Sequence, residues 1–410
     1  MNSENNRSNF AIYLTVAVAA LGYFVDVFDL IIFSIVRKAS LDDLGIAGPD
    51  SLAVGLNLLN CQLIGVVIGG VLWGVFGDKR GRLAVLFGSI LVYSVANLAN
   101  AFVHTKEAYE ACRVFAGLGL AGELGAGVTL VTELLNKSGK RGYGTMVIAG
   151  FGLLGAVFAA WISTHMHWRN VFITGGIMGL LLFVLRLGVQ ESKLYMDIRH
   201  SPIRKGDIMH FFSSGKRTWK YIKCILVDTH MYFVVGILLT GSPEIGTALG
   251  VTPLPTAGLV IGTAYFAMAL GDVASSLLSQ YLKSRKKAML VFHLLAFVAI
   301  ATFLYVPSPT LNGFLAKAFF LGFSVGSWAV VNVTAAEQFG TNLRALATTT
   351  VPNLIRALLI PISFIFNTLK PHYNIIDTAA VIGVCSVLCS LIFLKWTDET
   401  FGKNLDYTED

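Results

Sequence analysis

Twelve long apolar runs constrain this 410-residue chain more than any other feature of its sequence. A helix that crosses the hydrocarbon core of a bilayer needs about 20 predominantly apolar residues. The composition agrees, because 55% of the residues are hydrophobic and only 13% are charged. We therefore predict an all-α membrane protein with transmembrane helices near residues 10–36, 52–76, 83–103, 108–134, 143–163, 170–188, 222–242, 256–282, 288–305, 311–337, 345–368 and 378–396.

The basic residues are distributed unevenly between these runs. Most of the 31 Lys and Arg residues fall in alternate connecting segments, and basic loops of membrane proteins face the cytoplasm. This pattern predicts a multi-pass protein of the cell (inner) membrane with both termini in the cytoplasm. Because the cations behind the formal charge of +7 lie mostly in loops, the charge indicates topology, and no nucleic-acid partner is expected.

The chain also divides into two similar halves. We predict an N-terminal six-helix half over 1–188, a basic cytoplasmic linker over 189–221, and a C-terminal six-helix half with a short cytoplasmic tail over 222–410. One constant offset aligns the intramembrane cation Arg113 with Lys317, and the same offset aligns Glu133 with Glu337. Duplicated halves are common in transporters, so the prediction is two pseudo-symmetric six-helix bundles.

Two motifs resemble those of a known family. Gly74-x-x-x-Asp78-Lys79-x-Gly81-Arg82 is similar to the loop signature between the second and third helices of the major facilitator superfamily. Gly22-x-x-x-Asp26-x-x-Asp29 and Arg113-x-x-x-Gly117-x-Gly119-x-x-Gly122-Glu123 resemble the metabolite:proton and phosphate:proton symporter branches. The resemblance covers the whole chain and implies the major facilitator fold.

The same resemblance implies a gate on the cytoplasmic side. Glycines permit a tight turn there, and acids at helix ends accept hydrogen bonds. Arg344 and Asn353 resemble the eleventh helix of the metabolite symporters, and the spacing of Arg344 and Arg356 resembles that in animal organic-anion transporters. The implied gate residues are Gly74, Asp78, Lys79, Gly81, Arg82, Glu133, Arg141, Glu337 and Arg344.

Charged residues inside the predicted spans are functional candidates by default. A lone charge at the bilayer centre costs about 2.5 kcal/mol or more, so it faces a cavity or a partner. Asp26 and Asp29 share one helical face, and the helical rise places Asp29 at a depth similar to that of Arg113. A proton on Asp29 is expected to weaken its pairing with Arg113. The proton-coupling candidates are Asp29, Asp26, Arg113 and Glu123, with a structural ion pair as the alternative for each.

Arg356 is the leading candidate for binding substrate, because it lies near the middle of the eleventh run. Its planar guanidinium suits bidentate binding of a carboxylate or phosphate. The substrate-binding candidates are Arg356, Tyr23, Lys317, Tyr232, Trp328 and Asn353. Asp228 and Asp272 are interpreted as structural or gating residues, and His230 and His293 as packed, hydrogen-bonded residues with proton relay as the alternative.

These features predict a secondary transporter that couples proton entry to symport of a small anionic metabolite by alternating access. A uniporter or exporter of a neutral compound, a non-transporting nutrient sensor of the same fold and a channel remain alternatives. The sequence has no Walker motif and no clustered Cys/His ligand set, so no enzyme site, cofactor or metal is expected. The expected partners are the substrate, protons and the lipid bilayer, and we expect a monomer.

Overall fold

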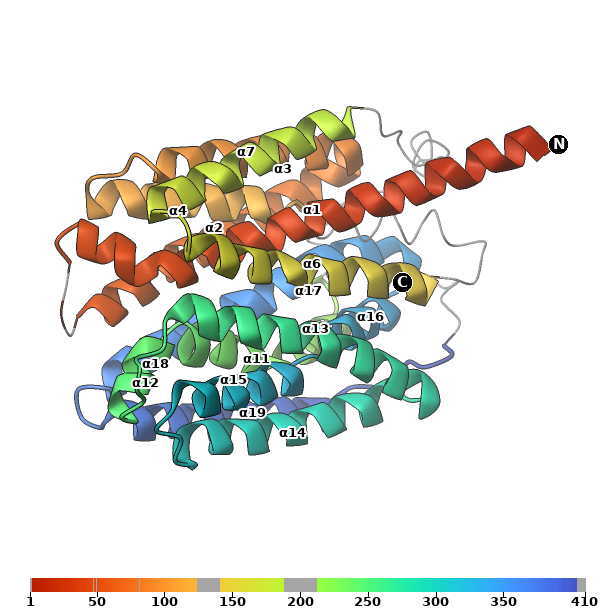
Figure 1. The fold of residues 1–410 in the computed structure, drawn as a ribbon. Helices are drawn as coiled ribbons and strands as arrows, with labels where there is room; N and C mark the ends of the chain where they lie inside the picture. Colours follow the sequence, from red (N-terminus) through yellow and green to blue (C-terminus); the bar gives the residue numbers. More distant parts are fainter. Residues whose placement is uncertain are drawn as a thin grey trace.

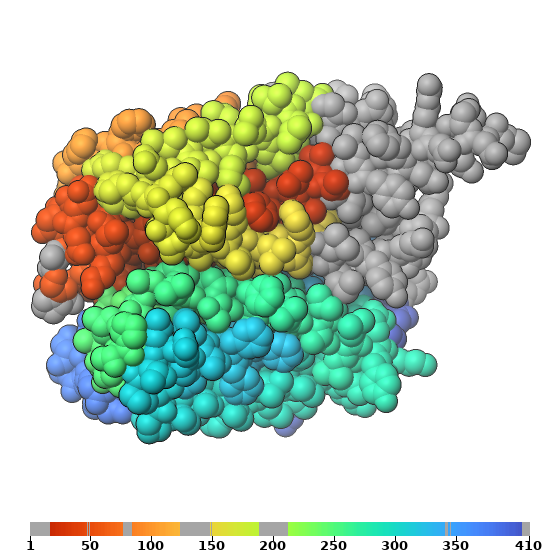
Figure 2. All heavy atoms as spheres, viewed as in Figure 1, coloured from red at the N-terminus to blue at the C-terminus, as the bar shows by residue number. Residues whose placement is uncertain are grey.

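The computed structural model is a bundle of helices that run side by side in two layers (Figure 1). It describes residues 2–46, 48, 50–80, 82–123, 141–187 and 212–403. The N-terminal half forms the upper layer of Figure 1 and the C-terminal half the lower layer, and Figure 2 shows the same division in the filled surface.

The upper layer contains six helices within the described residues. α1 (Asn2–Asp43) extends beyond the others at the end where it begins (Figure 1). The remaining helices of this layer are α2 (Ser51–Arg80), α3 (Arg82–Asn100), α4 (Lys106–Leu120), α6 (Arg141–Ser163) and α7 (Trp168–Arg186).

The lower layer combines continuous and interrupted helices. The continuous ones are α13 (Ala257–Tyr281), α14 (Arg285–Tyr305) and α19 (Ile375–Trp396). The interrupted ones are α15 (Leu311–Ser324) with α16 (Trp328–Gln338), α17 (Thr341–Ala357) with α18 (Leu359–Leu369), and α10 (Gly215–Leu226) with α11 (Thr229–Phe233) and the π-helical η2 (Val234–Leu239). A short helix, α12 (Ser242–Ala248), follows η2.

The helices fit a membrane. Eight spans of the described residues are long and apolar enough to cross a bilayer, and the bent pair of α10 with the α11–η2 segment makes a ninth. Ala84–Asn100 and Gly150–Ser163 are apolar but shorter, and the predicted run 108–134 lies partly outside the described residues. Within the described residues, each apolar run of the sequence coincides with a helix or with a helix that is interrupted by a break, so the all-α membrane fold is confirmed.

The predicted boundaries of the two halves and of the linker remain predictions. Most of the segment 189–221 lies outside the described residues, and α10 already begins at Gly215 within it. The two layers meet where α6 packs on α13 and where α2 packs on α17.

Glycines allow helices within each layer to touch. A Cβ added at Gly117 on α4 would lie 1.8 Å from the backbone oxygen of Gln62 on α2. In the lower layer, a Cβ at Gly322 on α15 would lie 2.0 Å from the backbone oxygen of Ala264 on α13. Such close approach of backbones is typical of helix pairs in membranes, so Gly117 of the sequence motif has a packing role.

Candidate functional site

An ion pair whose two partners are not hydrogen-bonded to each other joins the two layers, and we call it the unsaturated pair. Oδ2 of Asp26 on α1 lies 3.7 Å from Nη2 of Arg356 on α17, and the side chains are 0% and 1% exposed. This distance is too long for a hydrogen bond. Neither oxygen of Asp26 has a hydrogen-bond partner, and Nη1 of Arg356 has none. Both partners therefore keep hydrogen-bonding capacity for another group.

Aromatic side chains surround Arg356. Its Nε donates a hydrogen bond to the hydroxyl of Tyr232 at 3.2 Å, and Tyr232 packs edge-on against Trp328 with 6.2 Å between ring centroids. Tyr23 on α1 and Tyr265 on α13 lie close enough to Arg356 to interact with its charge. The sequence predicted this group except Tyr265, because nothing in an apolar helix marks which tyrosine faces the partner layer.

Arg113 and Asp29 lie in one region of the upper layer but form no ion pair with each other. The guanidinium of Arg113 donates instead to the side-chain oxygens of Asn100, Gln62 and Asn97, each at 3.3 Å. Asp29 is buried, and neither of its oxygens accepts a hydrogen bond. The amides thus satisfy Arg113, while Asp29 is left as a buried acid without a hydrogen-bond partner.

Glu123 is held by a cation of its own layer. Arg186 on α7 donates to both carboxylate oxygens of Glu123, with 2.8 Å between Nη1 and Oε2, and both residues are 2% exposed. Gly22 on α1 makes room for this bidentate pair, because a Cβ there would lie 2.1 Å from Nη2 of Arg186. Arg186 lies near the end of the predicted run 170–188 and was not among the charged candidates, so the sequence missed it as the partner of Glu123.

The other two predicted substrate-binding residues contact different surroundings. Lys317 donates to the backbone oxygens of Phe303 and Val306, at 3.2 and 2.9 Å, so its ammonium group caps the end of α14. Asn353 donates across the layers to the backbone oxygen of Ala121 at 3.1 Å. Asn353 also borders a small apolar cavity of about 100 Å³ between α2 and α17.

The layers are also joined at the end of the bundle opposite the start of α1. Arg37, which directly follows the predicted apolar run 10–36, is 1% exposed and forms an ion pair with Glu244 of α12 at 2.6 Å. Its guanidinium also lies 3.4 Å from the backbone oxygens of Ser51 in the upper layer and Thr240 in the lower layer. A cation at the end of an apolar run was the only sequence signal for this contact.

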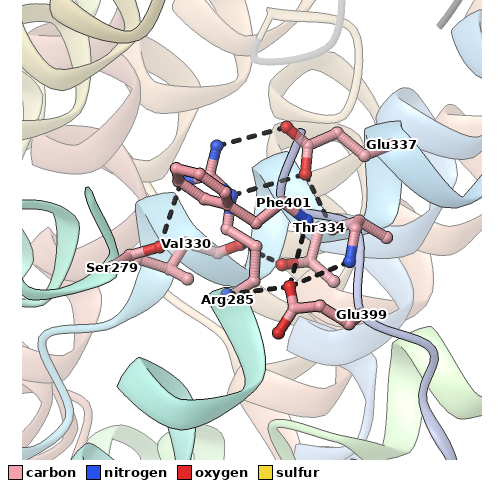
Figure 3. Close-up of polar contacts among 8 residues, drawn as sticks. Ser279, Arg285, Val330, Thr334, Glu337, Glu399 and Phe401 are labelled. Carbon is pink, nitrogen blue, oxygen red and sulfur yellow. Dashed lines mark hydrogen bonds and ion pairs between the residues drawn. The ribbon is translucent and has the colours of Figure 1, made fainter. Parts of the chain in front are cut away.

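A polar cluster joins the start of α14 to α16 and to the segment after α19 (Figure 3). Arg285 at the start of α14 pairs with Glu337 of α16 at 3.2 Å. The hydroxyl of Thr400, in the segment after α19, donates to the same carboxylate at 2.7 Å. Glu399 accepts from the hydroxyl of Ser284, the N-cap of α14, and from the backbone N–H of Arg285 at 2.9 Å. The predicted gate residue Glu337 therefore pairs within its own layer.

Glu399 lies outside the membrane-spanning segments and carries a shifted pKa. Partial burial acts to raise the pKa of Glu399, but hydrogen bonds from Ser284 and from backbone N–H groups outweigh that effect and lower it to about 2. A carboxylate at the N-terminus of α14 also interacts favourably with the helix dipole. The segment after α19 is thereby fastened to α14 and α16.

The structure describes few of the remaining predicted gate residues. The side chains of Asp78, Lys79, Arg82 and Arg141, and the residues Gly81 and Glu133, lie outside the described part of the chain. A Cβ added at Gly74 on α2 would lie 3.7 Å from the Leu346 side chain on α17. Arg344 donates to the backbone oxygens of Ala336 and Phe339, at 3.2 and 3.3 Å.

Comparison with known proteins shows which family and which relatives this chain is similar to. The Major Facilitator Superfamily profile matches residues 19–364. A protein of Haemophilus influenzae whose name describes metabolite transport is 27% identical over 403 residues, which cover 95% of this chain and 96% of that protein. The sialic acid transporter NanX of Escherichia coli (strain K12) is 26% identical over 82% of each chain. The gallate transporter of Pseudomonas putida is 26% identical over 46% of this chain and 42% of its own.

The fold has a close structural counterpart. The solved structure of the proton:xylose symporter XylE superposes with a TM-score of 0.73 and covers 97% of this chain and 98% of its own, at 18% sequence identity.

Proposed function

Because this chain belongs to the Major Facilitator Superfamily, we propose that it is a proton-coupled symporter that carries a small organic anion across the membrane by alternating access. The family and the fold are those of membrane transporters, not of enzymes. Proton coupling, the anionic substrate and the residues that serve them belong to the proposal.

The observation that carries the proposal is the unsaturated pair of Asp26 and Arg356. It is buried, it joins the two layers, and its partners stand 3.7 Å apart without a hydrogen bond. A permanent structural pair is better represented by Glu123 and Arg186, in which both carboxylate oxygens accept hydrogen bonds. Nη1 of Arg356 has no protein partner, so the guanidinium can donate to a substrate carboxylate.

Exchange of partners at this pair accounts for coupling. A proton on Asp26 neutralises the acid and frees Arg356, whose charge is then balanced by the anionic substrate. An anion without the proton leaves Asp26 negative beside it, and a proton without the anion leaves Arg356 unpaired. Each half-loaded state buries an uncompensated charge, which costs several kcal/mol. The empty and the fully loaded carrier avoid this cost and are the states that interconvert.

The aromatic surroundings of Arg356 favour an anion with a planar apolar part. Tyr232 accepts a hydrogen bond from Arg356 and packs against Trp328, both rings are buried together with Tyr23 and Tyr265, and aromatic rings pack well against one another. The name of the Pseudomonas putida relative specifies gallate, an aromatic carboxylate. Simple aromatic carboxylates are therefore the first substrates to test.

Two contacts between the layers, one on each side of the Asp26–Arg356 pair, fit alternating access. Arg37 and Glu244 join the layers at one end, and Asn353 joins α17 to the end of α4 on the other side of the Asp26–Arg356 pair. We propose that these contacts break alternately as the layers rock about the central site. Asp78, Lys79, Arg82, Glu133 and Arg141 are proposed to assist on the cytoplasmic side.

The test is uptake of aromatic carboxylates by proteoliposomes with an imposed proton gradient. We expect accumulation that collapses with a protonophore, and exchange without net accumulation in Asp26→Asn. Arg356→Lys is expected to weaken anion binding by about 1–3 kcal/mol, the strength of a charged hydrogen bond, with normal folding. Binding of the anion that is unchanged in both Arg356→Lys and Arg356→Ala, or accumulation of only neutral compounds, would overturn the proposal.

A further inference from the structure

The break between α10 and α11 places a buried acid where it has no structural partner. The two helices meet at a bend of 42°, and Asp228 occupies the N-cap position of α11 without making a capping hydrogen bond. Asp228 is 0% exposed, and neither of its oxygens has a hydrogen-bond partner. Within the described residues, no lysine or arginine pairs with it. A charge in this position needs a cation.

Two histidines complete the surroundings of Asp228. Nδ1 of His230 lies 3.7 Å from Oδ1 of Asp228, and the ring centroids of His230 and His293 lie 4.5 Å apart. One candidate ligand atom from each of the three residues lies within 4.8 Å of the others. The three residues come from the α10–α11 break and from α14, so the fold alone brings them together.

Hydrogen bonds fix which nitrogen of each histidine is free. Nε2 of His293 lies 2.8 Å from the backbone oxygen of Val227, which can only accept, so Nε2 is protonated and Nδ1 has a free lone pair. The hydroxyl of Ser390 donates to the backbone oxygen of Ser386. It therefore accepts from Nδ1 of His230 at 3.0 Å, which leaves Nε2 of His230 free. Nε2 of His230 and Nδ1 of His293 are both buried without a partner.

We propose that Asp228, His230 and His293 form a binding site for a divalent transition-metal cation of the Zn²⁺ class. Two neutral imidazoles and one carboxylate are a donor set that suits such cations, whereas Ca²⁺ and Mg²⁺ prefer oxygen ligands. Bonds of about 2.0–2.1 Å require ligand atoms roughly 3.4 Å apart in a tetrahedral site. The candidate ligand atoms lie within 4.8 Å of one another, so the three side chains move inward when the cation binds.

The site serves the lower layer as a clamp. The cation joins the α10–α11 break to α14 through His293, and Ser390 and Val227 orient the two imidazoles as outer partners. All of these residues belong to one layer, so the clamp stays intact while the layers move. Tyr232 follows His230 by two residues and accepts from Arg356, so the clamp also steadies the part of the central site that this tyrosine provides. The inference does not depend on the nature of the substrate.

The test uses the purified full chain carrying an affinity tag without histidines. We expect one equivalent of Zn²⁺ by titration, a rise in Tm on Zn²⁺ addition that EDTA reverses, and a visible Co²⁺ spectrum of a tetrahedral nitrogen–oxygen site. Asp228→Asn and His293→Gln are expected to weaken Zn²⁺ binding at least tenfold. The glutamine retains a donor for the Val227 oxygen.

Two further variants make the result specific. Ser390→Ala leaves all three ligands in place and removes an outer partner, so affinity should fall about 10- to 100-fold. Asp272→Asn serves as the matched control, because Asp272 is a buried acid of the same layer outside the cluster. Asp272 accepts a hydrogen bond from the backbone N–H of Ala329, and asparagine preserves this bond. The Zn²⁺ affinity of the Asp272→Asn protein should therefore match that of the wild type. The proposal is overturned if Zn²⁺ leaves Tm unchanged, as expected for an Asp228 that holds a proton instead. Equal Zn²⁺ affinity in the wild type, His293→Gln and Ser390→Ala would also overturn it.

Discussion

The dependence of anion binding on pH is the most direct consequence of the Asp26–Arg356 pair. In the unliganded protein the Asp26 carboxylate lies 3.7 Å from Arg356 and competes with an anionic substrate for the same guanidinium. Binding of the anion therefore takes up one proton. Once Asp26 is ionised in the free protein, each rise of one pH unit weakens binding tenfold, or about 1.4 kcal/mol. Over two pH units the loss is about a hundredfold.

The assay is equilibrium binding of a simple aromatic carboxylate such as benzoate to detergent-solubilised protein across neutral pH, where the ligand stays ionised. Asp26→Asn should bind independently of pH, with an affinity equal to that of the wild type at its acidic limit. Asp29→Asn is the matched control, because Asp29 is an equally buried acid one helical turn away, and it should keep the tenfold slope. A slope that persists in Asp26→Asn and vanishes in Asp29→Asn would assign the proton to Asp29, as the sequence predicted. A wild type without any slope would refute the coupling argument altogether.

Three further predictions follow from other contacts. Glu123→Gln leaves the buried Arg186 without a charge partner, so it should destabilise the protein by about 3–5 kcal/mol, measured as a fall in Tm; a near-normal Tm with lost proton coupling would instead indicate a coupling role. Glu244→Gln should weaken the closed contact with Arg37, which cysteine labelling detects as greater access to residues near α12 in the absence of substrate; unchanged labelling would contradict a gate. The pKa of Glu399 is lowered to about 2, so the attachment it provides is complete above the ordinary pKa of a glutamate and is lost only as the pH falls towards 2. Glu399→Gln should therefore increase proteolysis of the segment after α19 throughout the neutral pH range. Unchanged cleavage would show that Glu337 and Thr400 suffice to attach this segment.

The sequence predicted the helices well because bilayer thickness sets their length and apolar composition. It predicted α13 over 256–282, and the helix spans Ala257–Tyr281. It did not predict the break between α10 and α11, because no proline interrupts this run before Pro243, and the polar residues Asp228 and His230 were interpreted as single groups on one continuous helix. Breaks of this kind depend on packing against neighbouring helices, which a hydropathy pattern does not contain.

The partners of the buried charges were harder to predict from the sequence than the helices. Asp29 and Arg113 share a depth along the bundle axis, but depth fixes only one of three coordinates, and the amides of Asn97 and Asn100 occupy the guanidinium instead. Arg186 was not among the predicted intramembrane charges because it lies near the end of an apolar run, yet the structure buries it. Helix rotation and tilt decide such partners, and they follow from tertiary packing.

The saturation of hydrogen bonds separates structural charges from exchangeable ones in this protein. Arg113 and Lys317 occupy matched positions of the duplicated halves, and each is satisfied locally, by three amide oxygens in one case and by two backbone oxygens in the other. A group satisfied in this way gains little from releasing its partners, since a buried group left unpaired pays its full desolvation cost. Arg356 differs, because its strongest charge partner stands beyond hydrogen-bond distance and belongs to the other layer. A cation that must release and regain a partner during a transport cycle has to be held in this incomplete way. The matched cations of the two halves therefore fit a framework role, and substrate recognition is best sought at Arg356, for which the duplication offers no counterpart among the aligned charges.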